Sequence, residues 1–143
     1  MPMQTEKTYN HHQKQLHFIE AVQQLWDSKT FTRANLSRIC RRVATLSAPQ
    51  FYITPKQALE QYNRYKHTGR IYCKNPHIRQ MYIDIFERYE QQVSNGDDDF
   101  KYIIMQNVLS EPAPSFYINP NNAMTFYYRA MKYKRMLTQE GTL

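Results

Sequence analysis

The chain has 143 residues, which is enough for one domain or for two very small ones. It contains no apolar run of about 18 residues, so the sequence predicts no membrane-spanning helix. Nineteen Lys and Arg residues against twelve Asp and Glu residues give a formal net charge of +7, which favours acidic partners such as nucleic acid over cationic ones.

The amino-terminal segment, residues 1–12, is polar where a signal peptide would be apolar, so we expect a polar tail and a cytoplasmic protein. His11, His12 and His17 lie near this end, but their spacing matches no common zinc pattern. The two cysteines stand far apart in the sequence, which is typical of reduced thiols rather than of a metal site. We therefore expect neither a metal ion nor another cofactor.

The next segment predicts three helices. Apolar residues recur at helical spacing in the first two, at Phe18, Val22, Leu25 and Trp26 and then at Leu36, Ile39, Cys40, Val43 and Leu46. A short turn, Asp27–Phe31, joins them. The third helix begins at Pro55, because Thr54 is a good N-cap, proline suits the first helical position, and Gln57 completes a capping box. The three helices make up one unit, residues 13–70.

The segment that precedes the third helix recurs 65 residues later. Ala48–Pro55 reads APQFYITP and Ala113–Pro120 reads APSFYINP. When residues 48–64 are aligned with residues 113–129, nine of the seventeen positions are identical. Farther upstream the similarity fades to a pattern with a shift of 64 residues. Because such self-similarity indicates duplication, the sequence predicts two tandem three-helix copies, residues 13–70 and 76–137, that pack as one compact body with a shared core.

The second copy shows the same order of elements. Asn75 and Pro76 begin its first helix, which carries an apolar stripe at Ile78, Met81, Tyr82, Ile85, Phe86, Tyr89 and Val93. Three aspartates, Asp97–Asp99, then precede a helix over Phe100–Leu109, where carboxylates complement the positive end of the helix dipole. The last helix begins at Asn119-Pro120. Because no segment alternates with period two over a useful length, the predicted fold class is all-α.

The recurring motif has two interpretations, a ligand site or a buried staple. Ile53 and Ile118 occupy the position before each N-cap that a hydrophobic staple uses, so we favour packing. The motif resembles one found in small uncharacterised bacterial proteins, whose version reads roughly A-P-R-F-Y-V-S. The resemblance covers Ala48–Ala58 and Ala113–Ala123. Gln50 and Ser115 stand where that version has Arg, so no role of the Arg is carried over, and the resemblance implies no activity.

The densest group of cations lies on the second predicted helix. Arg38, Arg41 and Arg42 lie away from its apolar stripe, and Lys29 and Arg33 come just before them. Since the preceding turn is short, the first two helices resemble a helix-turn-helix whose second helix meets a duplex, and arginine suits phosphates and guanine edges. The alternative is an ordinary solvated face that keeps the protein soluble.

Further candidate nucleic-acid-binding residues follow the third helix and occupy the last one. They are Lys66, Arg70 and Lys74 in the first group, and Lys132 and Arg135 with Tyr128, Arg129 and Tyr133 beside them in the second. Residues 1–70 hold eleven Lys or Arg and four Asp or Glu, whereas residues 71–143 hold eight of each. The middle helix of the second copy has Lys101 as its single Lys or Arg, so the first copy should make most of the contacts with nucleic acid.

These features favour a small nucleic-acid-binding protein, an accessory or regulatory factor that contacts the phosphate backbone, of DNA rather than RNA. The alternative is a protein-interaction module that docks a protein partner or a second copy of the chain through a surface rich in Tyr and Met. With only Gly69, Gly96 and Gly141, the chain has no glycine-rich phosphate loop, so we expect no enzyme. A membrane-surface role is disfavoured because no helix combines a basic face with a broad apolar one.

Overall fold

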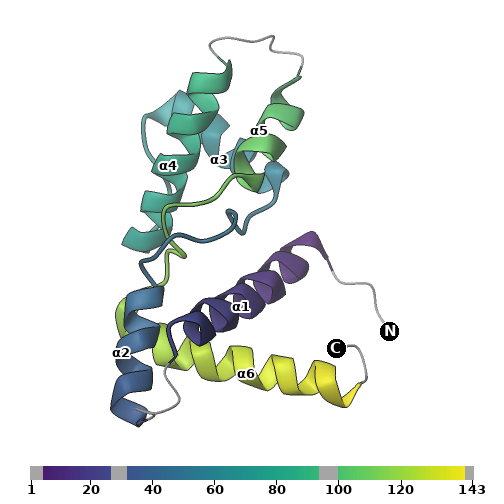
Figure 1. The fold of residues 1–143 in the computed structure, drawn as a ribbon. Helices are drawn as coiled ribbons and strands as arrows, with labels where there is room; N and C mark the ends of the chain where they lie inside the picture. The colour runs from purple at the N-terminus through teal and green to yellow at the C-terminus, as the bar shows by residue number, and fades with distance from the viewer. Residues whose placement is uncertain (1–4, 27–31, 94–99, 141–143) are drawn as a thin grey trace. The chain divides into compact units, whose positions relative to one another are not determined.

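The computed structural model of the chain describes residues 5–26, 32–93 and 100–140. Within these ranges the chain forms α-helices and no β-strand, which confirms the predicted all-α class (Figure 1). The helices are α1 (Glu6–Gln24), α2 (Arg33–Val43), α3 (Pro55–Thr68), α4 (Pro76–Val93), α5 (Lys101–Ser110) and α6 (Ala123–Gln139), and a 3₁₀ turn, η3 (Pro120–Asn122), precedes α6. None of the described helices is both long and apolar enough to span a bilayer.

The amino-terminal helix begins earlier than the sequence predicts. Thr5 caps α1, because its hydroxyl oxygen accepts a hydrogen bond from the backbone N–H of Thr8 at 3.1 Å. The segment predicted as a polar tail is therefore helical from residue 6 onward. The predicted turn Asp27–Phe31 and the aspartates Asp97–Asp99 lie outside the described residues.

The start of α3 matches the predicted capping box. The hydroxyl of Thr54 accepts from the backbone N–H of Gln57 at 3.1 Å, and the Gln57 side-chain oxygen accepts from the backbone N–H of Thr54 at 3.3 Å. Gly69 ends the helix with a φ of 71°, a left-handed conformation that suits glycine. The last helix differs from the prediction, because Asn119 caps the η3 turn and α6 begins only at Ala123.

The described helices form two compact units. Unit 1 consists of α1, α2 and α6 with η3, and unit 2, residues 49–113, consists of α3, α4 and α5. This grouping differs from the two contiguous segments 13–70 and 76–137 that the sequence predicts. The third helix of each predicted copy packs with the first two helices of the other.

Unit 1 has a core built mainly from α1 and α2. Its buried side chains include Phe18, Ile19 and Val22 of α1, Leu36, Cys40 and Val43 of α2, and Ala123 and Ala130 of α6. The Phe18 ring meets the edges of Phe126 and Phe116 at centroid distances of 5.1 and 5.6 Å. These aromatic contacts join α1 to α6 and to the loop before it.

Unit 2 has an aromatic core on α4. Tyr82, Phe86 and Tyr89 are buried with Met81 and Ile85, and α5 adds Met105, Val108 and Leu109. Tyr62 of α3 lies 4.8 Å from Tyr89, and Tyr65 of α3 stacks on Phe86 at 5.3 Å between ring centroids. The aromatic face of α3 thus finds its aromatic partners on α4, which is the physical reason for the grouping.

Burial repeats along part of the predicted duplication. Phe51 and Phe116 are both buried, as are Ala48 and Ala113, Ile53 and Ile118, and Ala58 and Ala123. This pattern agrees with a packing role for the motif. The first helices behave differently, since the shift of 64 residues pairs Ile19, which is 1% exposed, with Ile83, which is 41% exposed. The duplication itself stays a prediction.

Candidate nucleic-acid interface

The outer face of α2 carries a row of arginines. Thr32 caps the helix by accepting from the backbone N–H of Asn35 at 3.1 Å, and the buried stripe described above faces the core of unit 1. Arg38, Arg41 and Arg42 are exposed on the opposite face. The sequence of α2 contains no Asp or Glu, so no carboxylate of this helix neutralises the row.

One of these arginines has a side-chain partner outside α2. Arg41 Nη2 donates to Asn121 Oδ1 of η3 at 3.3 Å, which ties the α2 surface to the start of α6. Arg41 and Arg42 also lie in the last turn of α2, where cations complement the negative end of the helix dipole. A purely structural role accounts for part of this charge, but the dipole effect does not reach Arg33, which is exposed in the first turn.

The candidate cations divide between the two units. Unit 1 contains Arg33, Arg38, Arg41, Arg42, Lys132 and Arg135. Unit 2 contains Lys66, Arg70 and Lys74, and Lys29 falls outside the described residues. The sequence of unit 1 holds eleven Lys or Arg and four Asp or Glu, whereas that of unit 2 holds eight of each. Unit 1 therefore has the same excess of +7 as residues 1–70, because the cations that α3 takes to unit 2 are replaced by those of α6.

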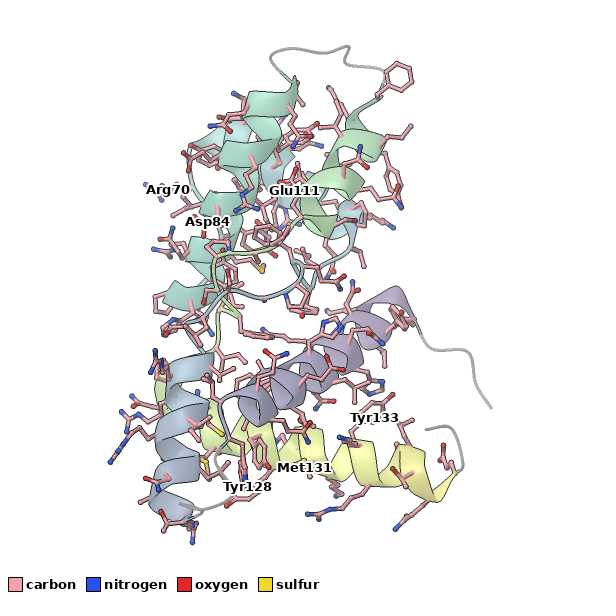
Figure 2. The ribbon with its side chains drawn as sticks, viewed as in Figure 1. Arg70, Asp84, Glu111, Tyr128, Met131 and Tyr133 are labelled. Carbon is pink, nitrogen blue, oxygen red and sulfur yellow. The ribbon has the colours of Figure 1, made fainter. Side chains whose placement is uncertain are left out.

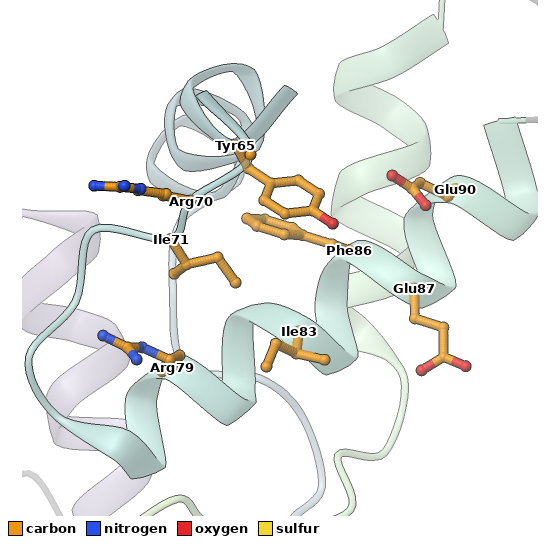
Figure 3. A pocket seen from close by; sticks show the side chains of 9 residues that line it. Tyr65, Arg70, Ile71, Arg79, Ile83, Phe86, Glu87 and Glu90 are labelled. Carbon is orange, nitrogen blue, oxygen red and sulfur yellow. The ribbon is translucent and has the colours of Figure 1, made fainter. Parts of the chain in front are cut away.

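Several cations of unit 2 have local partners. Lys66 Nζ lies 3.9 Å from a carboxylate oxygen of Glu90, and Arg88 Nη1 donates to the Pro112 carbonyl at 2.8 Å and lies 3.6 Å from Glu111. Arg70 lines a pocket of about 550 Å³. In this pocket Arg70 and Arg79 lie on one side of the stacked rings of Tyr65 and Phe86, and Glu87 and Glu90 lie on the other (Figure 3).

Unit 1 has a basic groove between α1 and α6, with a volume of about 520 Å³. Its lining residues are His11, His12, Gln15, Arg129, Lys132, Tyr133, Arg135, Met136 and Gln139. We call it the α1–α6 groove. Tyr133 lies on the side of α6 that faces α1 (Figure 2), where its ring stacks on His12 with centroids 3.9 Å apart and an interplanar angle of 17°. Among the described residues, three cations of α6 and no carboxylate line this groove.

Two residues that line the α1–α6 groove each have a buried polar atom without a partner among the described residues. Gln15 is only 5% exposed, and its Oε1 atom has no hydrogen-bond partner among the described residues. The same holds for Nδ1 of His12, one turn earlier on α1. Buried polar atoms in folded proteins are nearly always hydrogen-bonded, so two unpaired atoms in one groove call for an explanation.

Both histidines of the groove favour the neutral form. Burial lowers the pKa of His12, and burial followed by the charges of His12, Lys14 and Arg129 lowers the pKa of His11. A neutral imidazole has one nitrogen that accepts a hydrogen bond. At neutral pH the positive charge of the groove therefore comes from the three cations of α6.

The sequence indicated some of these residues and missed others. It placed Arg129, Lys132 and Tyr133 together, and the structure brings all three to the α1–α6 groove. Tyr128 is 48% exposed and is not among the lining residues. His12 and Gln15 were missed, although both lie at helical spacing upstream of Ile19 on the buried stripe of α1.

Among the described residues, no three His, Cys, Asp or Glu side chains come together as metal ligands. Burial raises the pKa of the Cys40 thiol to about 12, so this thiol stays protonated at neutral pH. No family model, curated protein or solved structure matches the chain.

Proposed function

We propose that unit 1 binds nucleic acid and that it does so mainly through the phosphate backbone. The observation that carries this proposal is the segregation of charge, because unit 1 holds the whole excess of +7 while unit 2 is formally neutral. A protein that neutralises phosphates with Lys and Arg gains affinity by releasing counterions. An excess of cations confined to one folding unit suits that purpose better than solubility, which needs charge of either sign.

Two basic features of unit 1 would act together. The arginine row of α2 is tied to Asn121 at the start of α6, and the α1–α6 groove is lined by residues 129–139 of the same helix. With a rise of 1.5 Å per residue, Asn121 and Arg135 lie about 20 Å apart along the chain axis of this segment. This distance corresponds to roughly six base pairs of B-DNA, so a short stretch of nucleic acid is long enough to span it.

Charge reversal at two arginines of α2 tests the proposal. Arg38→Glu combined with Arg42→Glu should weaken binding of a labelled oligonucleotide in fluorescence anisotropy, and the slope of log K against log salt should fall by about 2. The matched control is Lys56→Glu with Lys101→Glu, which makes the same change in net charge at exposed positions of unit 2. This control should bind nearly as well as the wild-type protein. Equal losses in both variants would show that net charge alone drives binding, and unchanged binding of the α2 variant would remove this helix from the interface.

The protein-interaction alternative has one feature in its favour. Phe100, Tyr102 and Ile103 at the start of α5 are about half exposed, which is unusual for three large apolar side chains so close in sequence. A protein partner would need no counterion release. Absence of oligonucleotide binding at low salt would therefore favour this alternative over nucleic acid.

A further inference from the structure

The pocket of unit 2 that Arg70 lines combines apolar surface with charges of both signs. We call it the α4 pocket. Ile71 and Ile83 line it between its arginine side and its glutamate side (Figure 3). Ile83 is 41% exposed, although its helix supplies most of the core of unit 2. The volume of about 550 Å³ falls within the range of about 300–1,000 Å³ that is typical of ligand sites. The α4 pocket therefore has the size and the mixed lining of a binding site.

Three residues of the α4 pocket follow one another along one face of α4. Arg79, Ile83 and Glu87 are each four residues apart, so successive members are separated by about 6 Å along the helix axis. Arg79 and Glu87 are therefore about 12 Å apart along this axis. A positive charge, an apolar side chain and a negative charge thus follow in order at an even spacing.

The charged ends of this row are accessible to a ligand. Arg79 and Glu87 are both exposed. Arg79 Nη2 donates to the carbonyl of Cys73 at 2.6 Å, which leaves other N–H groups of the guanidinium for a carboxylate. Arg70 is exposed on the same side of the α4 pocket and adds a second guanidinium (Figure 3). The pocket can therefore attract a negative group at one end and a positive group at the other.

An extended peptide repeats at nearly the same distance as this row. Its chain advances about 3.3 Å per residue and alternate side chains point to one face, so residues i, i+2 and i+4 are separated by about 6.6 Å each. An α-helix about 10 Å across would instead take up roughly 900 Å³ over a length of about 12 Å, which is more than the pocket holds. The spacing and the volume therefore favour an extended segment as the occupant.

We propose that the α4 pocket binds an extended peptide segment in which an acidic, an apolar and a basic residue alternate with neutral ones. The acidic residue lies at Arg79, the apolar residue on Ile83 and the basic residue at Glu87. This inference goes beyond nucleic-acid binding and does not depend on it, because the α4 pocket belongs entirely to unit 2. Since exposed ion pairs each contribute little free energy, the order of the charges provides selectivity in a weak interaction.

Two capped peptides of the same composition test this order. SESLSKS carries its acidic, apolar and basic residues in alternation, whereas SEKLSSS has its charges on adjacent residues, which point to opposite faces of an extended chain. In titrations followed by the amide NMR signals of α4, SESLSKS should bind about three to five times more tightly, because the isomer loses one ion pair. Equal binding of the two peptides, or no binding of SESLSKS at millimolar concentration, would overturn the inference and leave the proposed function of unit 1 standing.

A charge change at Glu87 should reverse a preference. The peptide SESLSES carries a second acidic residue where SESLSKS carries the basic one. The wild-type protein should prefer SESLSKS, and Glu87→Lys should prefer SESLSES, because the new cation then faces the second acidic residue. Glu60→Lys makes the same change in net charge at an exposed position of α3 and should keep the wild-type preference. A preference that stays the same in Glu87→Lys, or that changes equally in Glu60→Lys, would overturn the inference.

The apolar contact has a matched pair of variants. Ile83 and Ile103 are 41% and 51% exposed, so serine at either position should leave unit 2 folded. Ile83→Ser should weaken binding of SESLSKS roughly fivefold, because the apolar surface under the peptide is lost. Ile103→Ser, on α5, should bind like the wild-type protein. Weaker binding in Ile103→Ser alone would place the peptide on α5 and overturn the inference.

Discussion

Lys14 of α1 holds its charge in an unfavourable place. Its ammonium nitrogen lies 5.9 Å from the centroid of the Phe126 ring, and the side chain is only partly accessible to water. Burial lowers the pKa of Lys14 from 10.5 to about 8. Between these two values the unfolded chain binds a proton that the folded protein has released, so this residue makes stability rise with pH across that window.

Replacing Lys14 with Met should therefore stabilise the protein at pH 7. The gain is at most about 3 kcal/mol, because a shift of one pKa unit corresponds to about 1.4 kcal/mol. The gain should shrink as the pH rises from 8 to 10.5, because Lys14 of the wild-type protein then loses its proton first in the folded and later in the unfolded state. Chemical denaturation of both proteins at several pH values measures the difference, and the titration of other groups cancels in it. A gain that is the same at pH 7 and pH 10.5 would show that packing, not charge, causes it.

The residues of the α1–α6 groove show what a sequence can reveal at this scale. The arginines of α2 were predictable, because helical periodicity separates them from Leu36, Cys40 and Val43. His12 and Gln15 were not, since polar residues near an end give no apolar signal and lose exposure only when α6 packs beside them. Their spacing from Ile19 was the available clue.

At the scale of elements, the sequence predicted features that depend on local contacts but not those that depend on tertiary contacts. The start of α3 was predictable because Thr54, Pro55 and Gln57 act on one another within a single turn. The grouping of helices was not predictable from the order of the copies. Both α3 and α6 follow a similar loop, and they differ in their aromatic partners, which are Tyr89 for Tyr62 of α3 and Phe18 for Phe126 of α6.

The grouping predicts where each phenylalanine of the motif acts. Phe116→Ala should weaken the contact with Phe18 and speed amide hydrogen exchange in α1, α2 and α6. Phe51→Ala should act on α3, α4 and α5, because the Phe51 ring lies 5.2 Å from the guanidinium of Arg88. Each change should cost about 3–5 kcal/mol of local stability. The two variants control for each other, and faster exchange in α1 and α2 after Phe51→Ala would contradict the grouping.

At the scale of the molecule, the two units that differ in packing also differ in net charge. The net charge and its excess in residues 1–70 were readable from the sequence, but the set of helices that form the basic unit was not. Because α3 takes Lys56, Arg64 and Lys66 into unit 2, where Glu90 pairs with Lys66, the basic body is the one that contains α6. The predicted basic surface of the last helix therefore belongs to the same unit as the arginine row of α2.

Amide hydrogen exchange with and without a saturating single-stranded oligonucleotide tests this account most directly. Binding through unit 1 should slow exchange in α2 and along the α1–α6 groove, and leave α3, α4 and α5 unchanged. Raising the salt concentration should remove the effect. Slower exchange confined to α3, α4 and α5, or no change at any salt concentration, would contradict the claim that unit 1 binds nucleic acid.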